Sequence, residues 1–516
     1  MTDPGPPRAA GRHIRNAWHL ALFVLAAAAL VRLAFAAVIP LFPDETYYWE
    51  WSRHLAAGYF DHPWGIAALI RGGTGLAGAA GIGPSPIAVR LGVVVAGFLA
   101  ALFASAIARR LGGDRAGLLA ALVFSLMPLA AAGLVLATPD VPLLCTAAAG
   151  VYCVVRAVES KIHSPASLAW WIAAGLALGL AFSSKYTSIL FPVGVTIAVL
   201  TRRSLRARLG EAGPWAACLA ALTVFVPVLA WNSRHGWISF TFQLHHGLGA
   251  PSGSPLVREL ALVGGQAGLA TPILLVLLSI AVWRAVRRPA GDAHYLLAVV
   301  ALTCVGMFLF SAFRRPVEAN WPALAYIPAV PLLAATDWGV LGRRWLRWGL
   351  ALAAVVSCVV YVQAVVPVLP LPAPRDPVAR SAGWGQLADS VAAAQRLVAG
   401  DRVHAWVAAD KYQDASELAY HLAGHPVTFS LNLSSRPNQY DLWPGFRALA
   451  HVGDDLLLVL DEVPQPHHTA VVLAAHFASV EKGALVPLTR RDGGVATRRR
   501  IWILRGWKGT WPATEP

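Results

Sequence analysis

Long apolar runs recur through the first 374 residues of this 516-residue chain, and they limit its fold more than any other feature. A mean hydropathy of +0.57 and a charged fraction of only 13% exclude a soluble globular protein. We therefore predict a polytopic helical membrane protein with about 11 transmembrane helices, each near the roughly 20 residues that cross a bilayer. The expected spans are 17–39, 86–108, 116–137, 139–156, 167–183, 187–200, 213–231, 260–283, 293–312, 320–336 and 346–368.

Two features of these runs refine the prediction. The run 17–39 is longer than the core of a signal peptide, so we expect it to remain as the first span. The runs 167–183 and 187–200 are short for a hydrocarbon core of roughly 30 Å, so one of them is expected to be tilted or broken.

The distribution of basic residues predicts the orientation of the chain in the membrane. If the N-terminus is cytoplasmic, the inner connections carry a clear excess of Lys and Arg, which is the pattern of bacterial inner-membrane proteins. This excess also accounts for the net charge of +15 without a nucleic-acid partner. The inner residues are Arg8, Arg12, Arg15, Arg109, Arg110, Arg115, Arg156, Lys161, Arg202, Arg203, Arg206, Arg208, Arg284, Arg287, Arg288, Arg343, Arg344 and Arg347; the outer ones are Arg53, Arg71, Lys185, Arg234, Arg258, Arg314 and Arg315.

The composition changes after residue 374, where apolar runs give way to 15 Lys or Arg and 14 Asp or Glu among the last 142 residues. Short β-like runs at 402–410, 425–432, 454–462 and 499–507 alternate with a helical pattern at 414–424. We predict a transmembrane module over 1–374, with a first outer loop at 41–85, and a soluble α/β domain over 375–516 in the periplasm.

The first outer loop, "LFPDETYYWEWSRHLAAGYFDHP", gathers acids and aromatic residues directly after the first span. One interpretation is structural: Asp44 caps a helix, and the aromatic residues form an interfacial belt that lays this helix on the membrane surface. The other is functional, because a second outer turn carries Asp140 between Pro139 and Pro142. Asp140 in turn has its own structural alternative, as an Asx residue of the turn.

Two carboxylates with Lys and Arg on one membrane face suit transfer of a group from a phosphate-bearing donor. One carboxylate can accept a proton from an acceptor hydroxyl, and cations can neutralise the departing phosphate. The glycine-rich stretch at 72–81 lacks the features of a nucleotide-binding loop. The cysteines form no CxxC motif, and His245 with His246 completes no ligand set, so no tightly bound cofactor is expected and a divalent cation has no specific support.

The chain resembles the polytopic GT-C glycosyltransferases, in the bacterial branch related to protein O-mannosyltransferases and to lipid A aminoarabinose and galacturonic acid transferases. The resemblance rests on "DETYYWEWSRHLAAGYFDHP", "ATPDVPLL", "GLALGLAFSSKYTSIL", "RRPVEANWPALAYIPA", "GWGQLA", "ADKYQDASELAYHLAG" and "RPNQYDLWP". It implies inverting transfer of a sugar from a polyprenyl-phosphate carrier to an acceptor on the outer face, which is a lipid such as lipid A, another envelope glycan, or a protein.

The resemblance also implies roles for individual residues. Asp44 is the expected base, Glu45 its support, Asp140 a second essential carboxylate, and Lys185 a ligand of the carrier phosphate. Relatives often have Glu-Lys-Pro-Pro where this chain has Asp61-His62-Pro63-Trp64. His62 can replace the missing Lys in binding phosphate only when its ring is protonated. Asp61 and Tyr48 are further expected substrate-binding residues.

The remaining candidates have open alternatives. Arg234 and His235 bind phosphate or substrate, or they anchor a span end at the interface. Arg314, Arg315 and Glu318 form a clamp for phosphate or a uronic acid, or an ion-paired loop.

Two other function classes stay open at this stage, a lipid-linked sugar flippase and a scaffold that binds a partner through its C-terminal domain. The absence of an inverted repeat speaks against the flippase.

Overall fold

The computed structural model describes residues 9–249, 253–376, 378–399, 405–433, 436–462 and 467–512. Arg8 and residues 402–404, which belong to predicted features, lie outside these ranges. The chain forms two compact units. Unit 1 comprises Met1–Val38 and Leu55–Tyr361, and unit 2 comprises Ile39–His54 and Val362–Pro516. The segment around Asp44 therefore belongs with the C-terminal residues and not with the spans that flank it in sequence.

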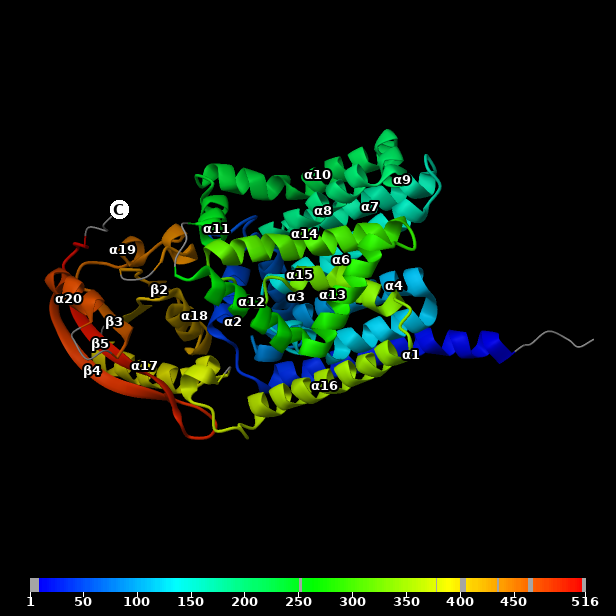
Figure 1. The fold of residues 1–516 in the computed structure, drawn as a ribbon. Coiled ribbons are helices and arrows are strands. Elements are labelled where there is room, and N and C mark those ends of the chain that lie inside the picture. The colour runs from blue at the N-terminus through cyan, green and yellow to red at the C-terminus, as the bar shows by residue number, and fades with distance from the viewer. Residues whose placement is uncertain are drawn as a thin grey trace, which may run out of the picture. The chain divides into compact units, whose positions relative to one another are not determined.

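Unit 1 is helical, and several of its long helices run side by side, as α8 and α14 do in Figure 1. Its helices are α1 (Ala9–Val38), α3 (Gly65–Ala79), α4 (Pro86–Leu126), α5 (Pro128–Gly133), α6 (Asp140–Glu159), α7 (Pro165–Phe182), α8 (Leu190–Thr201), α9 (Arg203–Arg206), α10 (Ala212–Arg234), α11 (Ile238–Leu248), α12 (Pro255–Ala270), α13 (Pro272–Arg287), α14 (Asp292–Arg314), α15 (Ala323–Ala335) and most of α16 (Val340–Val365).

The number of candidate spans is smaller than predicted. Among the described residues, seven helices are long and apolar enough to cross a membrane, and two bent helix pairs raise the number to nine at most. Two of the eleven expected runs account for the difference. The run 116–137 continues α4 beyond a break at Gly112 and Gly113, and the run 320–336 yields α15, which has only 13 residues.

The expected single span at 260–283 is wrong, because the chain turns there by 101° between α12 and α13. The turn lies at Thr271, whose φ of 69° is rare for a residue with a branched side chain. Pro272 follows and starts α13, and the Thr271 hydroxyl accepts a hydrogen bond from the Leu274 N–H. The short run 187–200 also continues into a bent pair, with a 106° change of direction after Thr201, as expected for a broken span.

Small residues allow α7 and α10 to pack closely. Gly175 and Gly179 are spaced four residues apart on α7 and face the backbone of α10. A Cβ at Gly175 would lie 2.2 Å from the carbonyl oxygen of Ala217, so no larger residue fits. This small-xxx-small pattern is typical of helix contacts in membranes, where close backbone approach replaces the hydrophobic driving force.

Unit 2 combines a mixed five-stranded sheet with helices. The strand order is β2-β1-β3-β5-β4, with β1 parallel to β2 and β3, and β5 antiparallel to β3 and β4. Its elements are α2 (Pro43–Arg53), α17 (Trp384–Ala399), β1 (Ala405–Ala409), α18 (Tyr412–His421), β2 (Thr428–Ser430), the 3-10 helix η5 (Gln439–Leu442), α19 (Phe446–Leu449), β3 (Asp455–Asp461), α20 (His468–Leu473), β4 (Phe477–Thr489) and β5 (Val495–Trp507).

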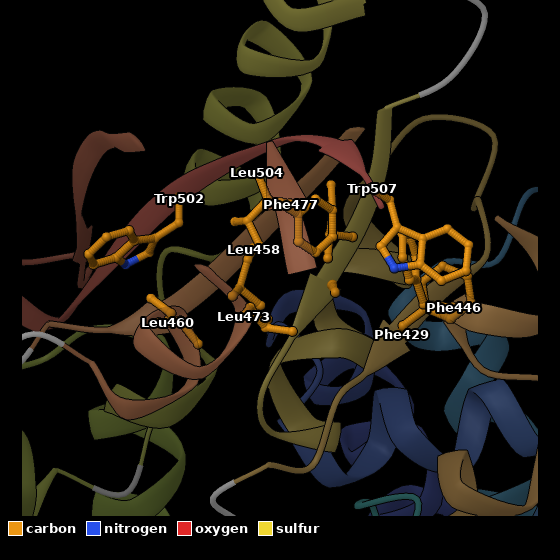
Figure 2. Packing of buried hydrophobic residues seen from close by; sticks show 12 residues of the cluster. Phe429, Phe446, Leu458, Leu460, Leu473, Phe477, Trp502, Leu504 and Trp507 are labelled. Atoms are coloured by element: carbon orange, nitrogen blue, oxygen red, sulfur yellow. The ribbon is translucent and has the colours of Figure 1, made fainter. Parts of the chain in front are cut away.

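The predicted α/β character of this region is confirmed, and four of the strands match predicted runs. The central strand β3 is apolar along almost its whole length, as expected for a strand with neighbours on both sides. Figure 2 shows its Leu458 and Leu460 in one cluster with Leu504, Phe477 and Leu473. The strand β4 was missed, because its side chains are largely exposed and its sequence carries no clean alternation.

Candidate functional site

A buried ion pair joins two of the residues predicted from sequence in unit 1. Lys185 Nζ donates to Oδ1 of Asp140 at 2.7 Å, and Asn320 Nδ2 donates to Oδ2 at 2.8 Å. Asp140 opens α6, Lys185 follows α7, and Asn320 precedes α15, so three separate segments meet at one carboxylate. Both oxygens of Asp140 are used in this way, which contradicts the alternative of an Asx residue that serves only its own turn.

The group formed by Asp140, Lys185 and Asn320 is accessible to solvent at Asn320. Asp140 and Lys185 are buried, whereas Asn320 is exposed. An ammonium group has three N–H donors, and among the described residues only Asp140 receives one from Lys185. Lys185 is therefore held in place by a carboxylate and keeps donors for a further oxyanion.

The two acids in the first turn of α2 in unit 2, Asp44 and Glu45, make different contacts. Phe42 is the residue before the helix, Pro43 is its first residue, and Asp44 is the second. The carboxylate of Glu45 accepts a hydrogen bond from the Phe42 N–H at 3.0 Å. The interpretation of Asp44 as the N-cap is therefore wrong, because Glu45 satisfies the free N–H group at this helix end.

The aromatic residues of α2 pack inside unit 2. The Tyr47 ring lies 4.3 Å from Tyr412 of α18 between centroids, and its hydroxyl accepts a hydrogen bond from the Gln439 N–H at 2.7 Å. Trp49 contacts Tyr420 of α18 edge to face at 5.1 Å. The prediction of an interfacial belt is therefore wrong for Tyr47, Trp49 and Trp51, which are buried in protein. Tyr48 is only half-buried.

Acidic groups are concentrated where α2 meets α18. Thr46 Oγ1 and Ser416 Oγ lie 3.1 Å apart across this contact. Burial raises the pKa of Asp44, and the positive charges of Arg380 and Arg436 offset part of that rise. Burial also raises the pKa of Glu417 well above its ordinary value, and nearby carboxylates, Glu45 and Asp44 among them, add to the rise. A carboxylate with a raised pKa is a stronger proton acceptor, which is the property expected of a general base.

The motif Asp61-His62-Pro63 forms a tight turn in unit 1. The Tyr59 N–H donates to the His62 carbonyl at 3.0 Å, and Gly58 bridges to Pro63. Asp61 is buried, and Gln243 of α11 donates to its backbone carbonyl at 2.7 Å. The turn is thus fixed to α11, and binding of a substrate by Asp61 or His62 remains a prediction.

The predicted clamp near residue 314 has other contacts. Arg314 Nε donates to the carbonyl of Leu248 at 3.4 Å, at the end of α11. A Cβ at Gly249 would lie 3.5 Å from Cζ of Arg315, so this side chain also points toward the end of α11. Glu318 is exposed. Arg258 is buried rather than part of an open loop, and it donates to two carbonyls at the end of α14.

Arg234 and His235 lie at the end of α10 and are exposed. The His235 ring stacks on Trp231 with centroids 4.0 Å apart, and its Nδ1 lies 2.8 Å from the Trp231 carbonyl. No group of three or more His, Cys, Asp or Glu side chains that could hold a metal ion occurs within the described ranges.

Sequence reasoning missed two residues that the structure adds. Asn320 lies in the quoted motif "RRPVEANWPALAYIPA", but nothing in its neighbourhood pointed to Asp140. Glu417 lies in the helical pattern of 414–424 next to positions of the buried face. An acid at the edge of an apolar helix face was the signal that could have identified it.

Sequence comparisons relate the chain to two groups of transferases. Residues 61–231 match the family described as dolichyl-phosphate-mannose-protein mannosyltransferase. The lipid A galacturonosyltransferase RgtD of Rhizobium johnstonii is 28% identical over 331 residues. That alignment spans 63% of this chain and 66% of RgtD, slightly less than two thirds of the relative's length.

Solved structures confirm the predicted fold class. The crystal structure of ArnT from Cupriavidus metallidurans, bound to undecaprenyl phosphate, covers 93% of this chain and 97% of its own, with a TM-score of 0.61 and 18% identity. The oligosaccharyltransferase AglB from Archaeoglobus fulgidus, in complex with an inhibitory peptide and a dolichol-phosphate, covers 86% and 69%, with a TM-score of 0.51 and 12% identity. The chain is thus a polytopic membrane protein with an ArnT-like fold and a C-terminal mixed-sheet domain.

Proposed function

We propose that this chain, a relative of the GT-C glycosyltransferases, transfers a sugar from a polyprenyl-phosphate carrier to lipid A. The family match and the likeness to ArnT support the donor class, since ArnT was solved with undecaprenyl phosphate. The relative RgtD supports lipid A as the acceptor and galacturonic acid as a candidate sugar. The basic residues of the inner connections support a reaction on the periplasmic face of the inner membrane.

The single observation that carries the mechanism is that the Asp44 carboxylate is desolvated and does not cap its own helix. Its carboxylate is not needed to cap α2, because Glu45 does this, and burial raises its pKa. In the proposed step Asp44 accepts the proton of an acceptor hydroxyl, and the oxygen of that hydroxyl forms a bond to the anomeric carbon of the sugar. The bond from that carbon to the carrier phosphate breaks with inversion, and polyprenyl phosphate leaves with the electron pair.

Lys185 is proposed to neutralise the leaving phosphate. Its ammonium lies 2.7 Å from Oδ1 of Asp140. Asn320 Nδ2 lies 2.8 Å from Oδ2 of Asp140 and so holds this carboxylate in place. A cation that is positioned before the reaction stabilises the developing charge without reorganisation. Asp140 is thus proposed to position Lys185, rather than to take part in proton transfer.

A transfer assay with the purified protein in detergent tests this function. The substrates are polyprenyl-phosphate galacturonic acid and lipid A, and the product is identified by mass spectrometry. We expect transfer by the wild type, and a loss of about 100-fold or more for Asp44→Asn, since a general base contributes about 10²–10⁴-fold. Activity in detergent, where no gradient exists, also separates an enzyme from a flippase.

A matched control comes from the same helix. Glu50 is another buried acid of α2, but it is ion-paired with Arg53 at 2.5 Å and has no assigned role in the reaction. Glu50→Gln should keep most of the transfer activity. If Asp44→Asn is folded and fully active, Asp44 is not the base; if the wild type transfers no sugar from any polyprenyl-phosphate donor, the function itself is wrong.

A further inference from the structure

A groove with a volume of about 540 Å³ lies in unit 1 between α7, α8 and α10, and its walls are almost entirely apolar. Leu200, Trp215 and Leu222 line it and are each at least half exposed, so the groove opens to the outside of the helices. Because α7 and α10 are candidate spans, this opening faces lipid rather than water. An acyl chain suits such a place, since it brings no polar group that would need a partner.

The groove is elongated along the helices. On α10 its lining extends from Pro214 to Phe225, a stretch about 17 Å long at a rise of 1.5 Å per residue. A long apolar groove of this kind fits an extended hydrocarbon chain better than a compact ligand.

One end of the groove is rich in arginine. Leu200 of α8 and Leu209 of the 3-10 helix η2 (Ala207–Gly210) both line the groove. Between them the chain bends by 106° after Thr201 and passes through α9. This connection carries Arg202, Arg203, Arg206 and Arg208, on the side of the membrane that the basic residues predict to be cytoplasmic.

Two acids neutralise two of these arginines. Asp292 accepts hydrogen bonds from Arg202 at 2.5 Å and from the Ser204 hydroxyl at 2.7 Å. Glu211 forms an ion pair of 2.9 Å with Arg208, and both side chains are buried. Both carboxylates are therefore occupied by partners of their own.

Arg203 and Arg206 keep their charges. Both are exposed, and within the part of the chain that the structure describes neither guanidinium forms a hydrogen bond or an ion pair. They are three residues apart in α9, so they lie on the same side of this helix, while Leu205 between them is buried. Guanidinium groups bind phosphate oxygens in a bidentate geometry. A pair of phosphate ligands thus adjoins the apolar groove.

We propose that the groove binds an anionic glycerophospholipid, with an acyl chain between α7, α8 and α10 and the phosphate head group at Arg203 and Arg206. Two uncompensated cations favour a lipid with a net negative charge over a zwitterionic one, whose own cation would oppose them. Basic sites between spans on the cytoplasmic side are typical places for anionic head groups. This binding does not depend on the proposed sugar transfer.

Polyprenyl phosphate also combines a chain with a phosphate, but the charges favour a different place for it. Lys185, the proposed ligand of the carrier phosphate, precedes α8, whereas Arg203 and Arg206 follow that helix. The two phosphate sites consequently lie at opposite ends of α8, and the carrier is one of the outcomes that the test below distinguishes.

Two exposed cysteines allow a site-specific test with the full chain in detergent. Cys218 lines the groove, whereas Cys358 of α16 does not. Their rates of alkylation by N-ethylmaleimide are measured by mass spectrometry during titration with dioleoylphosphatidylglycerol or dioleoylphosphatidylcholine. We expect the anionic lipid to protect Cys218 at a concentration at least about tenfold lower than the zwitterionic lipid. Cys358 should react at the same rate with either lipid.

The double variant Arg203→Gln/Arg206→Gln should lose most of this difference, while phosphatidylcholine still protects Cys218 and so shows that the groove is intact. Arg344→Gln/Arg347→Gln is the matched control, because these exposed arginines of α16 are also three residues apart and do not line the groove. It should keep the difference.

Three results would overturn the proposal: equal protection of Cys218 by the two lipids, a tenfold difference that persists in the Arg203/Arg206 variant, or protection by undecaprenyl phosphate at a lower concentration than phosphatidylglycerol. The last result would assign the groove to the carrier. Failure of sugar transfer in the wild type would contradict the proposed function but leave this binding result standing.

Discussion

Two carboxylates of this protein, Asp140 and Asp44, lie in different electrostatic surroundings. In unit 1 a lysine and an amide bind both oxygens of Asp140. In unit 2 Asp44 lies among other carboxylates, and burial raises its pKa despite two nearby arginines. Both oxygens of Asp140 are already engaged by N–H donors, whereas the desolvated carboxylate of Asp44 gains affinity for a proton. This difference supports the proposal that Asp140 positions Lys185 and that Asp44 accepts a proton.

The largest effect on stability is expected for the pair in unit 1. Lys185→Met removes the cation and leaves a buried carboxylate with only Asn320 as a partner. Loss of one partner of a buried pair costs about 3–5 kcal/mol of unfolding free energy. Thermal or denaturant unfolding of the purified protein in detergent measures this loss.

The double variant Asp140→Asn/Lys185→Met sharpens the comparison. It removes both charges, so it should recover much of the stability lost in Lys185→Met, and yet sugar transfer should stay low because the phosphate ligand is absent. A double variant that regains transfer together with stability would show that the pair has only a structural role.

An intermediate effect is expected where α2 contacts η5. Tyr47→Phe removes the acceptor of the Gln439 N–H, which is buried. An unsatisfied buried donor costs about 1–3 kcal/mol. Tyr48→Phe serves as the control because Tyr48 is half-buried on the same helix. Equal unfolding midpoints for the two variants would mean that the Tyr47 hydroxyl does not hold α2 in unit 2.

The contribution of Glu417 to the free energy of unfolding depends on pH. Burial raises the pKa of Glu417 in the folded state above the ordinary value of 4.5, so the folded state keeps a proton that the unfolded state releases. Stability therefore falls as pH rises above about 4.5, by at most about 1.4 kcal/mol per pH unit, until the folded pKa is reached.

Glu417→Gln removes this titration. Its unfolding midpoint should depend less on pH than that of the wild type between pH 5 and 8, and the variant should be the more stable protein at about pH 8. Identical pH dependence in both proteins would place Glu417 in an environment where its ordinary pKa is preserved.

The sequence located the apolar runs of unit 1 because hydropathy is a local signal, but it overestimated the number of spans. It failed at Thr271, where the chain bends within one apolar run, although the following proline disfavours a continuous helix. It also missed β4, whose exposed side chains lack a period-two pattern. These errors concern places where local composition does not determine the conformation.

Sequence reasoning named candidate residues, whose roles remain predictions, but not their surroundings. Asp44, Asp140 and Lys185 were chosen because they are acids and a lysine in predicted outer turns, and their roles were implied by the family resemblance. The packing of α2 on α18 joins Thr46 to Ser416 over 370 residues, and no periodicity in either segment predicts such a partner. The aromatic residues of α2 were therefore assigned to a membrane interface, although Tyr47 and Trp49 pack against α18 inside unit 2.

The pH dependence of sugar transfer tests the central claim, that Asp44 is the proton acceptor, most directly. The single-turnover rate should be measured for the wild type and for Asp44→Asn at saturating donor and acceptor. A base acts only when deprotonated, so the wild-type rate should rise with pH, with a midpoint above 3.8, the ordinary value from which burial raises the pKa of Asp44. Asp44→Asn should be at least about 100-fold slower and should lack this rise. A variant that keeps both the wild-type rate and the same acidic limb would contradict the account.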